Sequence, residues 1–166
     1  MGEKMYAHNK TSAGDILPIL KRVTIFSGLS EKDIFSIYES CDIVDANSGD
    51  VILKEGTPAT EIFILLSGRI TIMLNVDQTP LEVGDFGPGH CIGEASVIGI
   101  QNHSATAIVM ENTSLLVLSR KVLMLLYQQN AVLFSHLILN IAREIARRLH
   151  HTDEILLHYG RKIGQV

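Results

Sequence analysis

Between Cys41 and Ser119 the sequence alternates short apolar runs with clusters of turn residues, and this alternation restricts the fold more than any other feature. The runs are rich in Val, Ile and Thr, which favour β-strands. Clusters of Gly, Asp, Asn and Pro separate them at intervals of roughly ten residues, a pattern typical of a compact antiparallel sandwich or roll. The predicted strands are 43–46, 51–53, 61–66, 69–75, 81–83, 105–110 and 114–118.

Two short helices are predicted before this β region. Apolar residues recur at helical spacing from Asp15, after a segment (1–14) that looks like a loose leader. Ser30 is a suitable N-cap for the second helix, because Glu31 and Asp33 follow it in the first turn. The N-terminal helical part therefore covers residues 15–40.

Helical patterns also follow the β region. One helix is predicted over 121–128, and a long one from Val132 to about Tyr159. Apolar residues of the long helix recur every three or four positions and form a narrow seam of coiled-coil type. A helix this long outruns a roll of this size, so the seam predicts a homodimer, although the helix could instead pack only on its own roll. The seam residues are Ile141, Ile145, Leu149, Thr152, Leu156, Tyr159 and Ile163. Beside the seam, Glu144 with Arg143, Arg147 and Arg148 looks like an ordinary solvated flank.

A glycine-rich stretch, 87–99, is the strongest candidate for a binding site. Gly93 allows a sharp turn, Glu94 would open a short helix, and Gly99 would end it. The unpaired N–H groups at a helix start attract anions, phosphate above all. An ionised carboxylate only accepts hydrogen bonds, so Glu94 indicates a ligand that also carries hydroxyls. Phosphate and hydroxyl together suggest a nucleotide, whereas composition alone is equally compatible with a surface loop.

Composition and charge exclude several functional classes. The 166-residue chain has 46% apolar residues, enough for one domain with a substantial core, and a net charge of −4, which argues against a nucleic-acid-binding surface. Cys41 and Cys91 are too few for a disulfide framework and show no metal-ligand spacing. No signal peptide and no apolar run long enough to span a membrane are found, so we expect a cytoplasmic protein without a membrane partner.

Enzymatic and metal-dependent functions receive little support. The seven histidines include no His-x-His pair of the kind a cupin-like metal site would use, and no nucleophile constellation is recognisable. A haem-binding sensor stays open as an alternative, because histidine can ligate iron, but no residue stands out as the ligand. We therefore expect a protein that is not an enzyme and holds no metal.

Several motifs, in order, resemble the cyclic-nucleotide-binding domain family. Residues 93–98 (GEASVI), followed by 103–105 (HSA), resemble its phosphate-binding cassette, and the glycine-pinned segments 49–52, 55–58, 62–68 and 87–89 fall where the family's β-roll has them. The resemblance covers roughly Phe26 to Leu149. The segment 142–149 resembles the dimerisation helix of the bacterial catabolite activators, whose helix-turn-helix would follow. The chain ends at Val166, so no DNA binding is expected.

The resemblance implies a set of ligand-binding residues. Glu94 matches the residue that takes the ribose 2′-hydroxyl, Ser104 and Ala105 match phosphate contacts, and Thr152 matches a base contact. The implied set is Val83, Gly84, Ile92, Gly93, Glu94, Ala95, His103, Ser104, Ala105 and Thr152.

His103 departs from the family pattern, because it stands where the family has the arginine that pairs with the cyclic phosphate. Arginine offers a permanent charge and a planar fork, whereas the charge of histidine depends on pH. A neighbouring phosphate would favour protonated histidine, so His103 is either a weaker, titratable anchor or a surface residue of a site that has lost its ligand.

The sequence thus predicts a single α+β domain: an antiparallel β-roll (double-stranded β-helix or jelly-roll type) over 41–119 with its cassette at 89–107, N-terminal helices, and C-terminal helices over 120–166. The expected function is regulatory. A cyclic nucleotide, cAMP or cGMP, would bind in the roll and shift the junction near Arg120, and so change what the dimer presents. The alternative is a dimeric interaction module on the same fold, with an altered ligand or none.

Overall fold

The structure is a computed structural model that describes residues 13–163. Their order confirms the predicted class, with helices on either side of a β region. The helical elements are α1 (Ala13–Leu20), the 3-10 turn η1 (Thr24–Phe26), α2 (Glu31–Ser40), α3 (Glu94–Ile98), α4 (Arg120–Gln129) and α5 (Ala131–Ile163). The strands are β1 (Asp42–Ala46), β2 (Val51–Leu53), β3 (Glu61–Leu65), β4 (Arg69–Leu74), β5 (Leu81–Phe86), β6 (Cys91–Ile92), β7 (Thr106–Glu111) and β8 (Thr113–Ser119).

The strands form two four-stranded antiparallel sheets, in the orders β1-β8-β3-β6 and β2-β7-β4-β5. The seven predicted strands are all present, with ends that differ by up to three residues. The short strand β6 was not predicted. It pairs Ile92 with Phe63 and Cys91 with Ile64, and so attaches the glycine-rich stretch to the edge of the first sheet.

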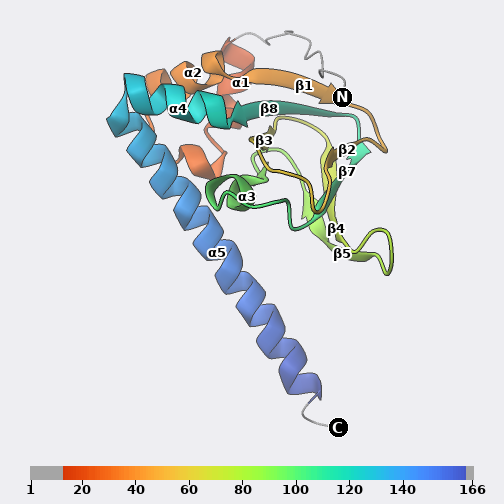
Figure 1. The fold of residues 1–166 in the computed structure, drawn as a ribbon. Helices are drawn as coiled ribbons and strands as arrows, with labels where there is room; N and C mark the ends of the chain where they lie inside the picture. Colours follow the sequence, from red (N-terminus) through yellow and green to blue (C-terminus); the bar gives the residue numbers. More distant parts are fainter. Residues whose placement is uncertain (1–12, 164–166) are drawn as a thin grey trace.

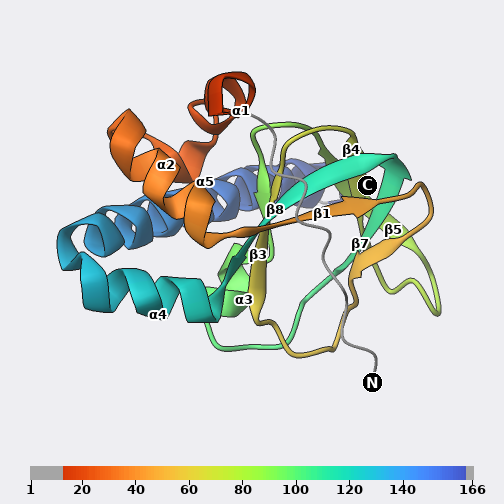
Figure 2. The ribbon, with the colours of Figure 1, turned by 90° about the horizontal axis from the view of Figure 1, so that it is seen from above.

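The sheet β1-β8-β3-β6 is covered on both faces, which explains why β3 and β8 are almost continuously apolar. Ile62, Ile64, Leu116 and Leu118 belong to the cluster formed with the helices. The alternate residues, Phe63, Leu65, Leu115 and Val117, pack in the second cluster against the other sheet. Figures 1 and 2 show the helices gathered on one side of the roll. The sheet β1-β8-β3-β6 therefore lies between a helical layer and the second sheet.

Side chains at the helix starts fix where α2 and α4 begin. The Ser30 hydroxyl accepts a hydrogen bond from the Asp33 N–H at 3.2 Å, which confirms the predicted N-cap. Ser119 caps α4 in the same way, accepting from the Val122 N–H at 3.2 Å. Helix α1 begins at Ala13, two residues inside the segment expected to be a loose leader, and residues 1–12 lie outside the described part.

Arg120, the first residue of α4, joins the roll to the C-terminal helices. Its guanidinium donates hydrogen bonds to the backbone oxygens of Ala59 (3.0 Å) and Val97 (3.3 Å), and its N–H donates to the Thr60 oxygen at 2.9 Å. The start of α4 is therefore tied both to the entry of β3 and to α3.

Helix α5 runs past the roll, and its C-terminal end lies clear of the other elements (Figure 1). Ile141 is fully buried and Ile145 packs on the same core, whereas Leu149 and Leu156, further along the same stripe, are exposed. The predicted seam is thus core in its first part and free surface beyond it within the described chain. The side chains of Tyr159 and Ile163 lie outside the described residues. No helix in the described range is long and apolar enough to cross a membrane.

Candidate functional site

A pocket of about 210 Å³ opens where the glycine-rich stretch, the second sheet and α5 meet, and we call it the roll pocket. Strands contribute its apolar wall, the segments 92–96 and 103–105 contribute most of its polar groups, and α5 contributes one side chain. The lining residues are Leu53, Ile72, Val83, Phe86, Ile92, Gly93, Glu94, Ala95, Ser96, His103, Ser104, Ala105 and Arg148.

Eight of the ten residues proposed from the sequence line this pocket, and Gly84 and Thr152 do not. Gly84 is paired with Ile72 across the β4–β5 hairpin, next to Val83. Thr152 is exposed on α5, and its hydroxyl donates to the Arg148 backbone oxygen at 2.9 Å. Within this single chain, Thr152 therefore lies outside the pocket where a base contact was expected.

Gly93 has the backbone conformation that the sequence predicted for it. Its φ of 86° and ψ of −8° lie in the left-handed region, and it caps the five-residue helix α3. A Cβ added there would lie 3.0 Å from the Glu61 oxygen and 3.6 Å from Cε1 of His103. Glycine is thus required by both conformation and space, and the imidazole of His103 lies directly beside this turn.

Glu94 is the most deeply buried charged group of the pocket, with 2% of its surface exposed. Its Oε1 accepts a hydrogen bond from Nη1 of Arg148 at 2.7 Å, while its Oε2 has no hydrogen-bond partner among the described residues. Burial raises the pKa of this carboxyl above its ordinary value, and Arg148 opposes that rise. The site therefore contains a buried acceptor that a hydroxyl could satisfy.

Arg148 is a pocket residue that the sequence analysis assigned to a solvated flank, and that assignment was wrong. Its Nη2 donates to the Cys91 backbone oxygen at 2.6 Å, its Nε donates to Oε1 of Glu144 at 3.0 Å, and its guanidinium carbon lies 5.2 Å from the Phe86 ring centroid. Glu144, also expected to be solvated, is buried. Arg148 stands seven residues after the buried Ile141, so helical spacing places both on one face, and this signal could have identified it.

His103 is buried, with 8% of its surface exposed, so it is not the surface residue of the alternative interpretation. Its backbone N–H donates to the Thr57 oxygen, and its oxygen accepts from the Gly56 N–H, both at 2.8 Å. Burial lowers the pKa of its imidazole, which favours the neutral form in the pocket as described. Arg148 is therefore the one permanent cation among the lining residues.

Neither a metal site nor a reactive cysteine is found in the described part of the chain. It contains no group of three or more His, Cys, Asp or Glu side chains that could hold a metal ion. Both cysteines are buried free thiols, and burial raises the pKa of Cys91, which makes its thiol unreactive.

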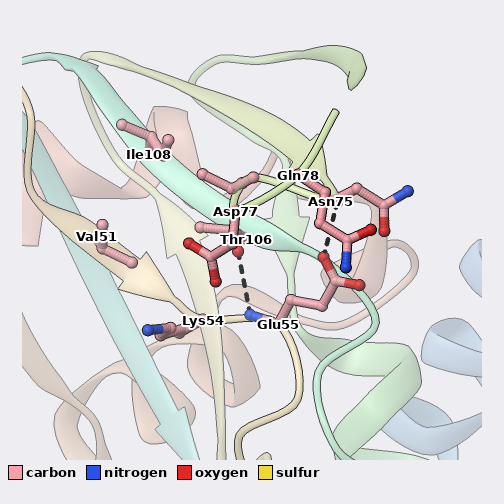
Figure 3. A pocket seen from close by; sticks show the side chains of 9 residues that line it. Val51, Lys54, Glu55, Asn75, Asp77, Gln78, Thr106 and Ile108 are labelled. Atoms are coloured by element: carbon pink, nitrogen blue, oxygen red, sulfur yellow. Dashed lines mark hydrogen bonds between the residues drawn. The ribbon is translucent and has the colours of Figure 1, made fainter. Parts of the chain in front are cut away.

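A second hollow, of about 390 Å³, lies between β2, β7 and the turn of the β4–β5 hairpin (Figure 3). Asn75, Asp77 and Gln78 of the turn face Lys54 and Glu55. The Glu55 carboxylate accepts from the Asn75 N–H at 3.0 Å, and the Glu55 N–H donates to the Thr106 hydroxyl at 3.1 Å. The first bond ties the hairpin turn to Glu55, the second anchors Glu55 on β7, and none of the residues proposed from the sequence lines this hollow.

Comparison with known proteins relates this architecture to one family. Residues 43–130, more than half of the chain, match the family described as "Cyclic nucleotide-binding domain". A cyclic nucleotide-binding domain from Methylobacillus flagellatus superposes with a TM-score of 0.77 at 21% identity, over 87% of this chain and 82% of that one. The catabolite activator protein of Thermus thermophilus superposes with a TM-score of 0.71 at 25% identity, over 80% of this chain and 61% of that one.

The curated relatives are much longer proteins. A lysophospholipase of Pyricularia oryzae is 29% identical over 135 residues, which is 81% of this chain and 8% of the lysophospholipase. This chain therefore corresponds to one small part of that relative.

Proposed function

This chain belongs to the family of cyclic nucleotide-binding domains, and from that premise we propose that it is a regulatory module that binds a cyclic nucleotide in the roll pocket. The nucleotide would be cAMP or cGMP. Its phosphate would meet the backbone at Ser104 and Ala105, and its ribose would meet Glu94.

The observation that carries this proposal is the free oxygen of Glu94. A buried carboxylate oxygen without a donor is costly, and it is the one buried side-chain polar atom without a partner among the described residues. The 2′-hydroxyl of a ribose would donate to Oε2 while Oε1 keeps its bond to Arg148. Hydrogen bonding to the ionised form would also lower the pKa of Glu94 and so offset the effect of its burial.

Arg148 would compensate in part for the missing cassette arginine. A cyclic phosphate carries a negative charge, and the neutral imidazole of His103 does not balance it. Arg148 reaches the pocket from α5 and already contacts Glu94 and the Cys91 oxygen. Ligand binding would then directly change the contacts that α5 makes with the pocket through Arg148.

The size of the pocket indicates how a nucleotide would lie. At about 210 Å³ it is smaller than the roughly 300–1,000 Å³ typical of ligand pockets. We expect the ribose and phosphate to fill it and the purine to lie at its mouth against the exposed Val83.

Calorimetry and thermal unfolding with cAMP, cGMP and 5′-AMP test the proposal. A cyclic nucleotide at a hundredfold excess over its dissociation constant should stabilise the fold by about 2.7 kcal/mol, and 5′-AMP should not. Glu94→Gln keeps the shape but weakens the acceptor, so affinity should fall about tenfold. The matched control is Glu82→Gln, which removes an exposed charge on β5 outside the pocket.

We also propose that the chain is a homodimer through the second half of α5. Support comes from the large apolar side chains that this half exposes, Leu149, Ile155, Leu156 and Leu157, since a second copy would cover them. If no cyclic nucleotide stabilises the protein but the dimer is found, the alternative of an interaction module takes the place of the sensor.

A further inference from the structure

A third hollow, of about 530 Å³, lies between the turn that follows α1 and the first half of α5, and we call it the basic pocket. Lys21 and Arg22 line it from the turn, and Arg143 and Arg147 line it from the helix. Four of the 14 Lys and Arg residues of a chain with net charge −4 thus meet at one place. The basic pocket shares no lining residue with the roll pocket.

The positive charge of the basic pocket is only partly balanced. Lys21 forms an ion pair with Glu31, and Arg147 forms one with Glu144. Neither Arg22 nor Arg143 has a carboxylate partner within residues 16–158, whose side chains the structure describes. Two guanidinium groups are therefore left for an external anion.

A buried amide at the floor of the basic pocket holds its two walls together. Asn140 is 8% exposed, and its Nδ2 donates to the backbone oxygens of Ile25 (3.1 Å) and Ser27 (2.7 Å). Its Oδ1 accepts a hydrogen bond from Nη1 of Arg143 at 3.2 Å. Because one side chain ties the segment after α1 to α5 and also contacts Arg143, the two walls of the basic pocket are fixed relative to each other.

We propose that the basic pocket binds a small anion that carries two linked phosphate groups. The planar fork of each guanidinium matches a pair of phosphate oxygens, and both unpaired cations of the basic pocket are arginines. A volume of about 530 Å³ exceeds what a single phosphate needs, and the two unbalanced charges suit a multiply charged ligand. This inference does not depend on the roll pocket binding a nucleotide.

Glu144 is the internal competitor of such an anion. Its carboxylate pairs with Arg147 on the side of the basic pocket and with Arg148 on the side of the roll pocket. A bound diphosphate would compete with Glu144 for Arg147. Removing the carboxylate charge therefore frees a third guanidinium for the anion.

Calorimetric titration of the full chain with inorganic pyrophosphate at low salt tests the proposal. The double variant Arg22→Gln/Arg143→Gln should bind pyrophosphate about tenfold or more weakly than the wild type. The control Lys32→Gln/Lys121→Gln removes two exposed positive charges outside the basic pocket and should leave binding within about twofold. Equal losses in both double variants would overturn the proposal, because they would indicate only a general charge effect.

Amide NMR shifts locate the anion and separate it from the roll pocket. Pyrophosphate should move the signals of Thr24 and Ser27, which line the basic pocket. Shifts confined to Gly93 and Ala105, or no saturable binding at all, would refute the site. Glu144→Gln should bind pyrophosphate more tightly than the wild type, and a weaker affinity in this variant, with its fold intact by circular dichroism, would also count against the proposal.

Discussion

Breaking the ion pair between Arg148 and Glu94 should lower the free energy of unfolding by a measurable amount. Arg148→Met keeps much of the apolar stem of the side chain but removes the guanidinium. Glu94, which is 2% exposed, then loses its one cationic partner, while Glu144 keeps Arg147. The variant therefore leaves one uncompensated carboxylate at the bottom of the roll pocket.

Removing one partner of a buried ion pair costs roughly 3–5 kcal/mol. The Arg148 side chain is 31% exposed, so water already screens part of the interaction and the expected loss is about 2–3 kcal/mol. For a chain of this length each kcal/mol corresponds to about 2–4 °C in Tm, which predicts a fall of about 4–12 °C. The double variant Glu94→Gln/Arg148→Met should recover most of the loss, because the side chain left without its cation is then neutral, while Glu144 keeps Arg147.

The loss should also depend on pH. Without Arg148 the main influence that opposes burial is lost and only a backbone hydrogen bond still lowers the pKa of Glu94, so this pKa in the folded state rises further above its value of about 4.3 in the unfolded chain. A carboxyl with a raised folded pKa contributes stability that is present at low pH and is lost as pH rises through the folded pKa. The deficit of Arg148→Met should therefore be largest near pH 8 and shrink towards pH 5.

Urea unfolding followed by far-UV circular dichroism is the suitable assay, because the chain has no tryptophan. All variants should be compared at one protein concentration, since dimerisation would shift the apparent stability. Arg147→Met is the matched control, because it removes the neighbouring, exposed guanidinium. Equal losses of stability in Arg148→Met and Arg147→Met would refute the role of the buried ion pair. So would a Glu94→Gln/Arg148→Met variant that recovers none of the lost stability.

Two further predictions concern the ligand and the dimer. His103→Arg should bind cyclic nucleotide about ten- to a hundredfold more tightly, since a charge-assisted contact is worth roughly 1.5–3 kcal/mol. Burial lowers the His103 pKa and a bound phosphate would raise it, so wild-type affinity should increase on acidification below about pH 6.5, and calorimetry should find this dependence absent in His103→Arg. Leu149→Asp/Leu156→Asp should convert a dimer into a monomer in sedimentation measurements, because both side chains are exposed in the single chain, and a wild-type monomer at micromolar concentration would refute the interface.

The strands could be predicted because their signals are local. Nearly continuous apolar runs bounded by turn or polar residues predict that β3 and β8 are buried, and the structure places both strands between two layers. The two-residue strand β6 carries no such signal. Cys91 and Ile92 become a strand only because Ile64 and Phe63 of β3 lie beside them, and that pairing spans almost thirty residues of sequence.

The lining of the pocket could be predicted where its residues are close together in the sequence, but not where a helix from a distant part of the chain contributes a residue. Gly93, Glu94 and Ser104 form a recognisable motif, and they line the roll pocket. Arg148 contacts Glu94 across 54 positions of sequence, so its role became visible only once α5 was placed in space. Thr152 lies one helical turn beyond Arg148 and does not line the roll pocket of the single chain, so its contact with the base stays a prediction.

The guanidinium of Arg120 has a mechanical consequence for a regulatory domain. Because it binds the backbone at both Ala59 and Val97, a displacement of α3 relative to the first turn of α4 would strain or break the hydrogen bond to Val97. The bending point expected near Arg120 stays a prediction. Asn130 is the single residue between α4 and α5, and its side chain caps α5 by accepting a 3.0 Å hydrogen bond from the Leu133 N–H. A ligand that moved α3 would therefore act on the start of α4 through the Arg120 guanidinium, and on α5 through the core that α4 and α5 share.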